Sequence, residues 1–133
     1  MTEKLSISSG HADILEAPLT AVLTTVGADG QPQSTAVWFL VDDDGVLKGS
    51  VTTDRQKYRN LTRNPNATLF VLDPTNPFRT VEIRATVELV PDPGKAMLPK
   101  FAAHYNTPVE MLDAPGSERV TDVFTPVKVV TVG

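Results

Sequence analysis

A hydroxyl-rich segment followed by closely spaced cations is the part of this sequence best suited to bind an anion. Residues 50–53 read Ser-Val-Thr-Thr, and Arg55 and Lys57 follow. Thr53 and Gln56 fit the first and last positions of the S/T-x-x-E/Q capping box, which predicts a helix that begins at Thr53. The free N–H groups and the helix dipole make that end positive, so cations there are favourable beside a bound anion. The pattern predicts a phosphate site.

The same cations also fit a solvated helix face. Arg55, Arg59 and Arg63 are spaced four residues apart and would form one basic stripe, with Tyr58 and Leu61 on another side. Charge runs are more often solvated surface than binding sites. The residues alone leave both interpretations open.

The rest of the sequence offers no catalytic constellation. His11 and His104 belong to no zinc pattern, and the serines have no evident base partner. The three carboxylates at positions 42–44 lack the alternate spacing of a calcium loop, so we expect a solvated turn there. Catalytic residues therefore stay unassigned and no metal site is predicted. An enzyme with this sequence would take its chemistry from a cofactor, and the phosphate site favours a phosphorylated one.

Apolar and β-branched runs predict a mainly β domain with two or three short helices. Helices are expected at residues 7–17 and 55–63, and in a third segment that opens at Asp92-Pro93. Pro99 lies within that segment, so the third helix should either be kinked or start later. Strands are expected at residues 19–26, 33–41, 46–52, 67–72 and 78–89, with one or two more within 119–132. About six twisted antiparallel strands most economically close into a small barrel.

Side-chain alternation predicts how three of these strands face the core. Residues 78–89 alternate cleanly, with apolar residues on one face and Glu82 and Arg84 on the wet face. Residues 67–72 are apolar throughout, which is typical of a strand covered on both faces. Along residues 33–41, alternation places Trp38 on the face opposite Gln33 and Thr35.

Length and composition indicate one globular domain over residues 1–133. The apolar content of 41% suffices for a core. The sequence contains no run of 18 apolar residues, so we expect no transmembrane helix. The first 17 residues contain no continuous apolar run, so we expect no secretory signal and a cytoplasmic location. The net charge of −4 argues against non-specific binding to nucleic acid or membranes. Without cysteine there is no disulfide or thiolate chemistry.

Three segments, in their order along the chain, resemble a known family. They are Ala-Val-Leu-Thr-Thr-Val-Gly-Ala-Asp-Gly-Gln-Pro-Gln at 21–33, Arg-Gln-Lys-Tyr-Arg-Asn-Leu at 55–61 and Arg-Thr-Val-Glu-Ile-Arg-Ala at 79–85. With the order of elements, they resemble the flavin/deazaflavin oxidoreductase superfamily, the pyridoxamine 5′-phosphate oxidase-like split β-barrel family. The chain is most similar to its small actinobacterial branch that uses coenzyme F420. The resemblance covers nearly the whole chain and implies a six-stranded antiparallel split β-barrel.

The resemblance also implies a homodimer with two cofactor sites at the subunit interface. Arg55 and Lys57 would hold the cofactor phosphate, and Phe78 of the partner subunit would cover the cofactor. The residues expected to line the ring or the sugar-like chain are Gln33, Thr35, Ser50, Val51 and Thr52. Trp38 would be either a wall of the ring pocket or a core or interface aromatic, and strand alternation favours the second role.

The activity implied is that of a reductase that passes a hydride from reduced F420 to a small conjugated or unsaturated substrate. The proton for the product would come from solvent or from a hydroxyl such as that of Thr35. Residues 126–133 lack the Arg-x-His element with which true pyridoxamine phosphate oxidases grip their substrate, so vitamin B6 oxidation is disfavoured. Three alternatives remain: an FMN-dependent oxidoreductase of the same fold, a non-catalytic carrier of flavin or haem, and a vestigial site in which the basic helix is only surface.

Overall fold

The computed structural model describes residues 6–7 and 10–133. Its helical elements are α1 (Ala12–Glu16), α2 (Gln56–Arg63), α3 (Met97–His104) and the 3-10 turn η1 (Val109–Met111). Its strands are β1 (Ala21–Val26), β2 (Pro32–Val37), β3 (Leu40–Val41), β4 (Leu47–Thr52), β5 (Asn66–Asp73), β6 (Asn76–Pro91) and β7 (Arg119–Val132). A mainly β chain with three short helices is therefore confirmed.

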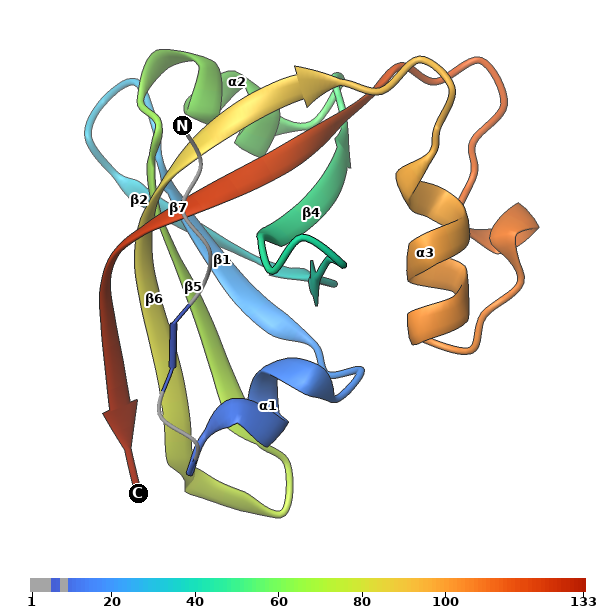
Figure 1. Ribbon diagram of the computed structural model, residues 1–133. Helices are drawn as coiled ribbons and strands as arrows, with labels where there is room; N and C mark the ends of the chain where they lie inside the picture. Colours follow the sequence, from blue (N-terminus) through green and yellow to red (C-terminus); the bar gives the residue numbers. More distant parts are fainter. Residues whose placement is uncertain (1–5, 8–9) are drawn as a thin grey trace.

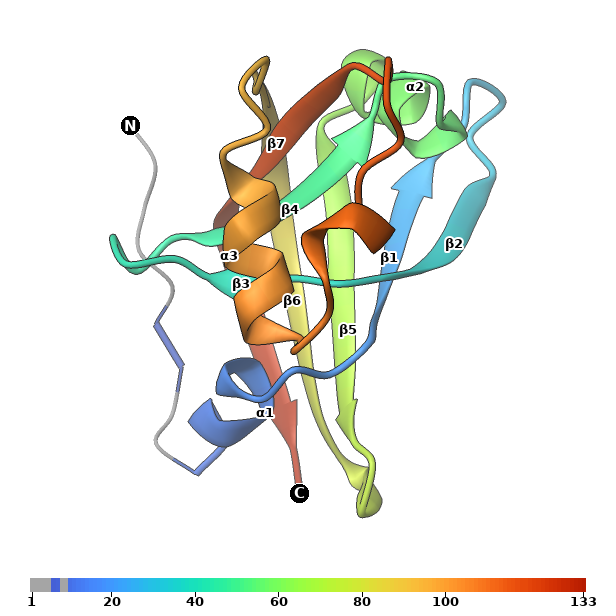
Figure 2. The ribbon, with the colours of Figure 1, turned by 90° about the vertical axis from the view of Figure 1, so that its right-hand side faces the viewer.

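The seven strands form one antiparallel sheet in the order β2-β1-β5-β6-β7-β4-β3. The sheet curls into a half-barrel, with α2 at one end and α1 at the other (Figure 1). Figure 2 shows α3 standing in front of β3 and β4. The predicted barrel class is confirmed with one strand more than expected, and β7 is a single strand whose register with β6 shifts beside Pro126.

The extra strand arises because the segment predicted at 33–41 breaks in the middle. β2 ends at Val37 and β3 starts at Leu40. At the break, the hydroxyl of Tyr105 accepts the N–H of Phe39 at 3.0 Å and lies 2.7 Å from the carbonyl oxygen of Leu19. The Tyr105 side chain therefore replaces strand pairing at this point.

We expect Tyr105→Phe to lower the free energy of unfolding by about 1–3 kcal/mol, because the N–H of Phe39 loses its acceptor. Urea unfolding followed by circular dichroism measures this loss. Tyr58→Phe is the matched control, since the hydroxyl of Tyr58 makes no hydrogen bond in the described part of the chain. Equal midpoints for the two variants would contradict the bracing role of Tyr105.

The core fills the inside of the curled sheet. Alternate residues of the central strands are fully buried, and Ile14 and Leu15 of α1 close one end. The buried apolar side chains from the strands include Leu23, Leu47, Leu69, Val71, Val81, Ile83 and Phe124. The predicted alternation of β6 is confirmed, with Val81 and Ile83 inside.

β5 differs from its prediction. Phe70 and Leu72 remain 37% and 42% exposed, so within this chain β5 is covered on one face and not on both. The reason is that no helix or strand of the described residues forms a second layer over this outer face of the sheet (Figure 1). The apolar run thus reflects an exposed apolar strip as well as the core.

α1 begins later than predicted, and α3 begins as one of its two predicted alternatives has it. α1 starts at Ala12, and residues 8–9 of the predicted helix lie outside the described residues. α3 starts at Met97, which confirms the later start, and its first N–H groups bond to the carboxylate of Asp92. None of the helices in residues 6–7 and 10–133 has the length and apolar character needed to span a membrane.

The turn at positions 42–44 is less solvated than predicted. The side chain of Asp42 is only 7% exposed and forms ion pairs with Lys48 at 2.8 Å and Lys100 at 2.7 Å. Burial alone would raise the pKa of Asp42, but the hydrogen bonds from Lys100 and Lys48 hold it well below its usual value. This buried carboxylate ties the β3–β4 turn to α3.

Candidate cofactor site

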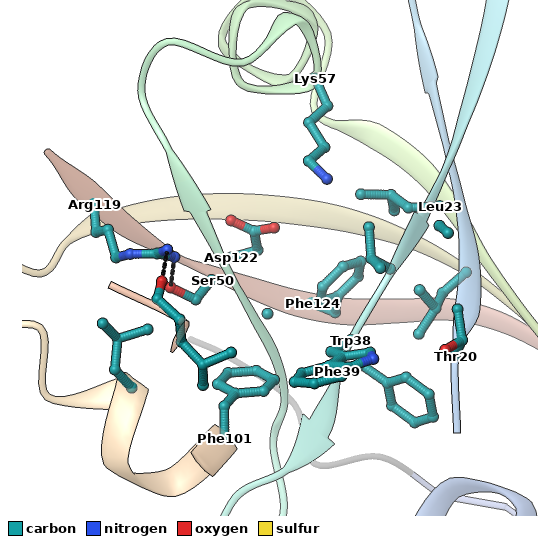
Figure 3. Close-up of a pocket in the computed structure, with 16 residues that line it drawn as sticks. Thr20, Leu23, Trp38, Phe39, Ser50, Lys57, Phe101, Arg119, Asp122 and Phe124 are labelled. Atoms are coloured by element: carbon teal, nitrogen blue, oxygen red, sulfur yellow. Dashed lines mark hydrogen bonds between the residues drawn. The ribbon is translucent and has the colours of Figure 1, made fainter. Parts of the chain in front are cut away.

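A cavity of about 480 Å³ opens between β1, β4, β7 and α3 (Figure 3). We call it the main cavity. Its walls are mostly apolar and aromatic, with a few polar groups at one side. The lining residues are Thr20, Leu23, Ala36, Val37, Trp38, Phe39, Gly49, Ser50, Lys57, Leu69, Leu98, Phe101, Leu112, Arg119, Asp122 and Phe124. An apolar cavity with a few convergent polar groups is typical of a site for a small organic ligand.

Trp38 forms an aromatic wall of this cavity. Its ring stacks on that of Tyr105 with centroids 4.1 Å apart and planes 5° from parallel. Of its two predicted roles, the cavity wall fits this lining position, and the core aromatic fits its packing against the cluster of Leu40, Met97 and Phe101. Strand alternation, however, was no basis for the prediction that it lies opposite Gln33. β2 ends at Val37, so the alternation on which that prediction depended does not reach Trp38.

A second cavity of about 310 Å³ adjoins the first, and we call it the basic groove. Ser50, Lys57 and Arg119 line both cavities. The other lining residues of the groove are Val51, Thr52, Asp54, Arg55, Ala114 and Ser117. Three cations and several hydroxyl groups against one exposed carboxylate suit an anionic ligand.

Lys57 and Arg119 lack a carboxylate partner within ion-pair distance in the described part of the chain. Burial lowers the pKa of Lys57, and the nearby Arg55 lowers it further, whereas Asp122 raises it. Arg119 donates to Ser50 Oγ at 3.1 Å and to the carbonyl oxygen of Leu112 at 2.6 Å, while its Nε is buried and has no hydrogen-bond partner among residues 6–7 and 10–133. A bound anion would supply the missing negative charge.

The helix that carries Lys57 starts differently from its prediction. α2 begins at Gln56, and Arg55 occupies the N-cap without a side-chain cap. Thr53 instead donates its hydroxyl to Glu118 Oε1 at 3.1 Å, and its backbone N–H bonds to the carbonyl of Glu118. The capping-box prediction is wrong because Thr53 is held by the segment that leads into β7.

Asn60 anchors α2 to the sheet. Its side chain is fully buried, and Nδ2 donates to Thr25 Oγ1 at 3.0 Å and to Gln33 Oε1 at 2.9 Å. Its Oδ1 accepts from Gln56 Nε2 at 2.9 Å. This network joins α2 to β1 and β2 and so fixes where Lys57 projects. The exposed Arg59 fits the solvated-face interpretation, since among the described residues its guanidinium bonds to Gln56 and the Asp54 carbonyl.

The structure gathers five of the eight predicted site residues around the groove: Ser50, Val51, Thr52, Arg55 and Lys57. The other three lie outside both cavities. Gln33 supports Asn60, Thr35 lies exposed on β2, and Phe78 lies 81% exposed near the start of β6. Their contacts with a cofactor stay predictions.

Sequence reasoning gave the cavity wall as the less favoured of two roles for Trp38, and it missed Arg119 and Asp122. Arg119 and Asp122 lie on β7, which pairs with β4 through Thr52–Arg119 and Gly49–Asp122. Only that distant pairing brings them to Lys57. Asp122 is 4% exposed, and burial raises its pKa to about 7, although Lys57 acts in the opposite direction. The described residues include no cluster of side chains that could hold a metal ion.

The family model described as pyridoxamine 5′-phosphate oxidase matches residues 8–130. The chain belongs to this family. The resemblance seen in the sequence is thereby confirmed, and the half-barrel around the main cavity is the family's fold. None of the curated proteins matches the chain in sequence.

Solved structures of family members and of other proteins with this fold are similar to the chain. An F420 reductase is 41% identical, with a TM-score of 0.84, over 93% of this chain and 98% of its own. A conserved hypothetical protein from Mycobacterium tuberculosis is 24% identical, with a TM-score of 0.77, over 98% and 89%. The haem storage protein HutZ from Vibrio cholerae is 16% identical, with a TM-score of 0.76, over 97% and 96%. The last two show the shared fold alone, whereas the first supports membership among flavin-type oxidoreductases.

Proposed function

We propose that this protein is a reductase that uses coenzyme F420 to reduce a small conjugated or unsaturated substrate. The observation that carries the proposal is the junction of the two cavities. Ser50, Lys57 and Arg119 line both, so one ligand could place a flat ring in the main cavity and an anionic tail in the basic groove. The 41% identity with an F420 reductase supports the same cofactor.

The residues present fit such a ligand. Lys57, Arg119 and Arg55 offer cationic donors without a carboxylate partner at ion-pair distance among the described residues, which suits a phosphate. The hydroxyl of Ser50 is already held by Arg119 at 3.1 Å and is preorganised to donate to an anion. Trp38 and Phe101 offer flat apolar surfaces beside the ring space.

The bound deazaflavin would supply the hydride. The protein contributes position and environment. The cations of the groove fix the tail, and so they set how deeply the ring enters the main cavity. The apolar walls around Leu98, Phe101 and Leu112 exclude water from the space that remains for the substrate.

A parallel titration with coenzyme F420, FMN and haemin, followed by fluorescence or absorbance, tests the proposal. We expect F420 to bind at least tenfold more tightly than FMN or haemin, which corresponds to a difference in binding free energy of about 1.4 kcal/mol. Turnover of reduced F420 with a conjugated enone should then be faster with protein than without it. Preference for FMN would indicate the FMN-dependent alternative, and preference for haemin without turnover would indicate a carrier.

Lys57→Ala should weaken binding of F420 by about 10- to 100-fold, because a charged hydrogen bond contributes about 1.5–3 kcal/mol. The free energy of unfolding should change by less than about 0.5 kcal/mol, since Lys57 makes no ion pair within the described residues. Fluorescence titration gives the Kd, and urea unfolding gives the stability. Arg63→Ala on the same helix, outside both cavities, should leave the Kd unchanged. An unchanged Kd in Lys57→Ala would contradict the phosphate site.

We infer that the protein works as a homodimer. The outer face of β1 and β5 exposes Val22, Phe70 and Leu72 by 37–42%, and Val22 pairs directly with Phe70. Adjacent exposed apolar side chains on a sheet favour association. Light scattering should give about twice the 14.4 kDa of one chain. Phe70→Glu should reduce that mass, and a monomeric wild type would overturn the inference.

A further inference from the structure

Asp122 is the ionisable side chain of the main cavity to which the proposed function assigns no role. It is 4% exposed, and its Oδ1 is buried without a hydrogen-bond partner among the described residues. The carboxyl nevertheless lines a cavity that can admit a ligand. A buried polar atom without a partner is unfavourable, so a ligand that satisfies it gains affinity.

The neighbouring strand makes room for this carboxyl. Asp122 pairs with Gly49 on β4 and with Leu89 on β6. A Cβ atom at Gly49 would lie 3.2 Å from Asp122 Oδ2, which is tighter than an ordinary contact. Figure 3 shows the carboxyl rising from β7 into the space toward which the amino group of Lys57 points. The glycine therefore leaves the carboxyl free to meet a ligand.

Few charges face Asp122. Lys57 approaches from α2, and Arg119 lines the same cavity from β7 itself. The paired residues on β4 and β6 carry no charge, while Lys48 and Glu88 pair with Val123 and therefore project to the opposite face. Burial raises the pKa of Asp122 to about 7 and Lys57 lowers it, so both protonation states are accessible near neutral pH.

We propose that Asp122 is a specificity-determining residue, whose protonated carboxyl donates a hydrogen bond to a carbonyl oxygen of a conjugated ligand in the main cavity. The inference rests on the proposed function, because that carbonyl belongs either to the deazaflavin ring or to the substrate. A neutral carboxyl donates and an ionised one only accepts, so ligand binding selects the protonated form. Binding above pH 7 must then take up a proton and must weaken as the pH rises.

Isothermal titration calorimetry in two buffers of different ionisation enthalpy measures this proton uptake. In one arm, coenzyme F420 is added to the protein. In the other, cyclohex-2-enone is added to the protein loaded with oxidised F420. We expect one arm to show uptake of about one proton at pH 8 and little at pH 6, with affinity falling about tenfold per pH unit above 7. The arm with uptake identifies whether the carbonyl is that of the cofactor or of the substrate.

Asp122→Asn is the matched variant, since its amide stays neutral and can still donate. It should bind at pH 6 within about threefold of wild type, and the uptake and the pH dependence should disappear. Uptake that persists in Asp122→Asn, or is missing from both arms in wild type while F420 binds, overturns the role of Asp122 and leaves the proposed function standing. If F420 binds the wild type neither at pH 6 nor at pH 8, both the role of Asp122 and the proposed function are wrong.

A second measurement needs no variant. In protein labelled with ¹³C at the aspartate carboxyl carbons, the Asp122 resonance should titrate near pH 7 without ligand. It should stay in its protonated position up to pH 8 when the ligand is bound. A resonance that titrates unchanged in the complex overturns the proposal.

Discussion

Asp122→Asn should make the ligand-free protein more stable relative to wild type as the pH rises from 4 to 8, by about 4 kcal/mol in total. The cause is burial, which raises the pKa of this carboxyl from about 3.9 in the unfolded chain to about 7 in the folded one. That difference corresponds to about 4 kcal/mol of unfolding free energy. It is the largest stability change that we expect from a single substitution.

The sign follows from proton binding. Between pH 4 and pH 7 the folded protein holds a proton on Asp122 and the unfolded chain does not. The contribution of Asp122 to the free energy of unfolding of the wild type is therefore present at low pH and is lost as the pH rises through 7. The asparagine does not titrate, so its own burial cost is the same at every pH. Urea unfolding of both proteins at pH 4, 6 and 8 gives the difference directly.

Asp42→Asn provides the opposite control. The pKa of Asp42 is held below its usual value, because the hydrogen bonds from Lys100 and Lys48 outweigh burial. Its stabilisation is therefore present above the unfolded pKa and is lost as the pH falls, so this variant should be weakest relative to wild type at neutral pH. If Asp122→Asn lost stability relative to wild type from pH 4 to 8, as Asp42→Asn should, the neutral burial of Asp122 would be wrong.

The second large effect is expected for Asn60→Ala, which should lower the free energy of unfolding by about 2–4 kcal/mol. The substitution leaves the buried hydroxyl of Thr25 without its partner and opens a cavity under α2. Because Asn60 also bonds to Gln33 and Gln56, the helix should lose its fixed position on the sheet. Urea unfolding measures the first effect, and F420 titration measures the second as a weaker Kd at temperatures where the variant is folded.

Thr62→Ala is the matched control on the same helix. Thr62 is exposed, and within the described part of the chain its hydroxyl bonds only to the backbone of Arg59, so its replacement should change stability by less than about 0.5 kcal/mol. If Asn60→Ala loses stability but keeps the wild-type Kd, Lys57 does not depend on this anchor. If it keeps the stability as well, the network contributes nothing measurable.

Local patterns were sufficient to predict most of the sheet. The alternation in residues 78–89 follows the core because β6 has one face inside and one outside. Asn64-Pro65 ends α2 where expected, since Pro disfavours helical conformation in the residue before it. In the site, the cations at 55 and 57 and the hydroxyls of the strand before them were found from residue types alone.

The remaining features depend on contacts between distant segments. The break after Val37 is fixed by Tyr105, which no local window around residues 33–41 contains. Thr53 matches a capping box, but its contact with Glu118 prevails over that local preference. Arg119 and Asp122 reach the cavity only through the pairing of β7 with β4, and a polar residue within a strand gives no sign of which cavity it lines.

That pairing also sets an order of assembly. The hairpins β1–β2 and β5–β6 join neighbours in sequence and can form early, whereas β4–β7 joins residues 47–52 with 119–124 and must close a long loop. The floor of the main cavity and one side of the basic groove exist only after this closure. Ligand binding therefore becomes possible at a late step of folding, and a ligand added to refolding protein should trap the finished state without accelerating the hairpins.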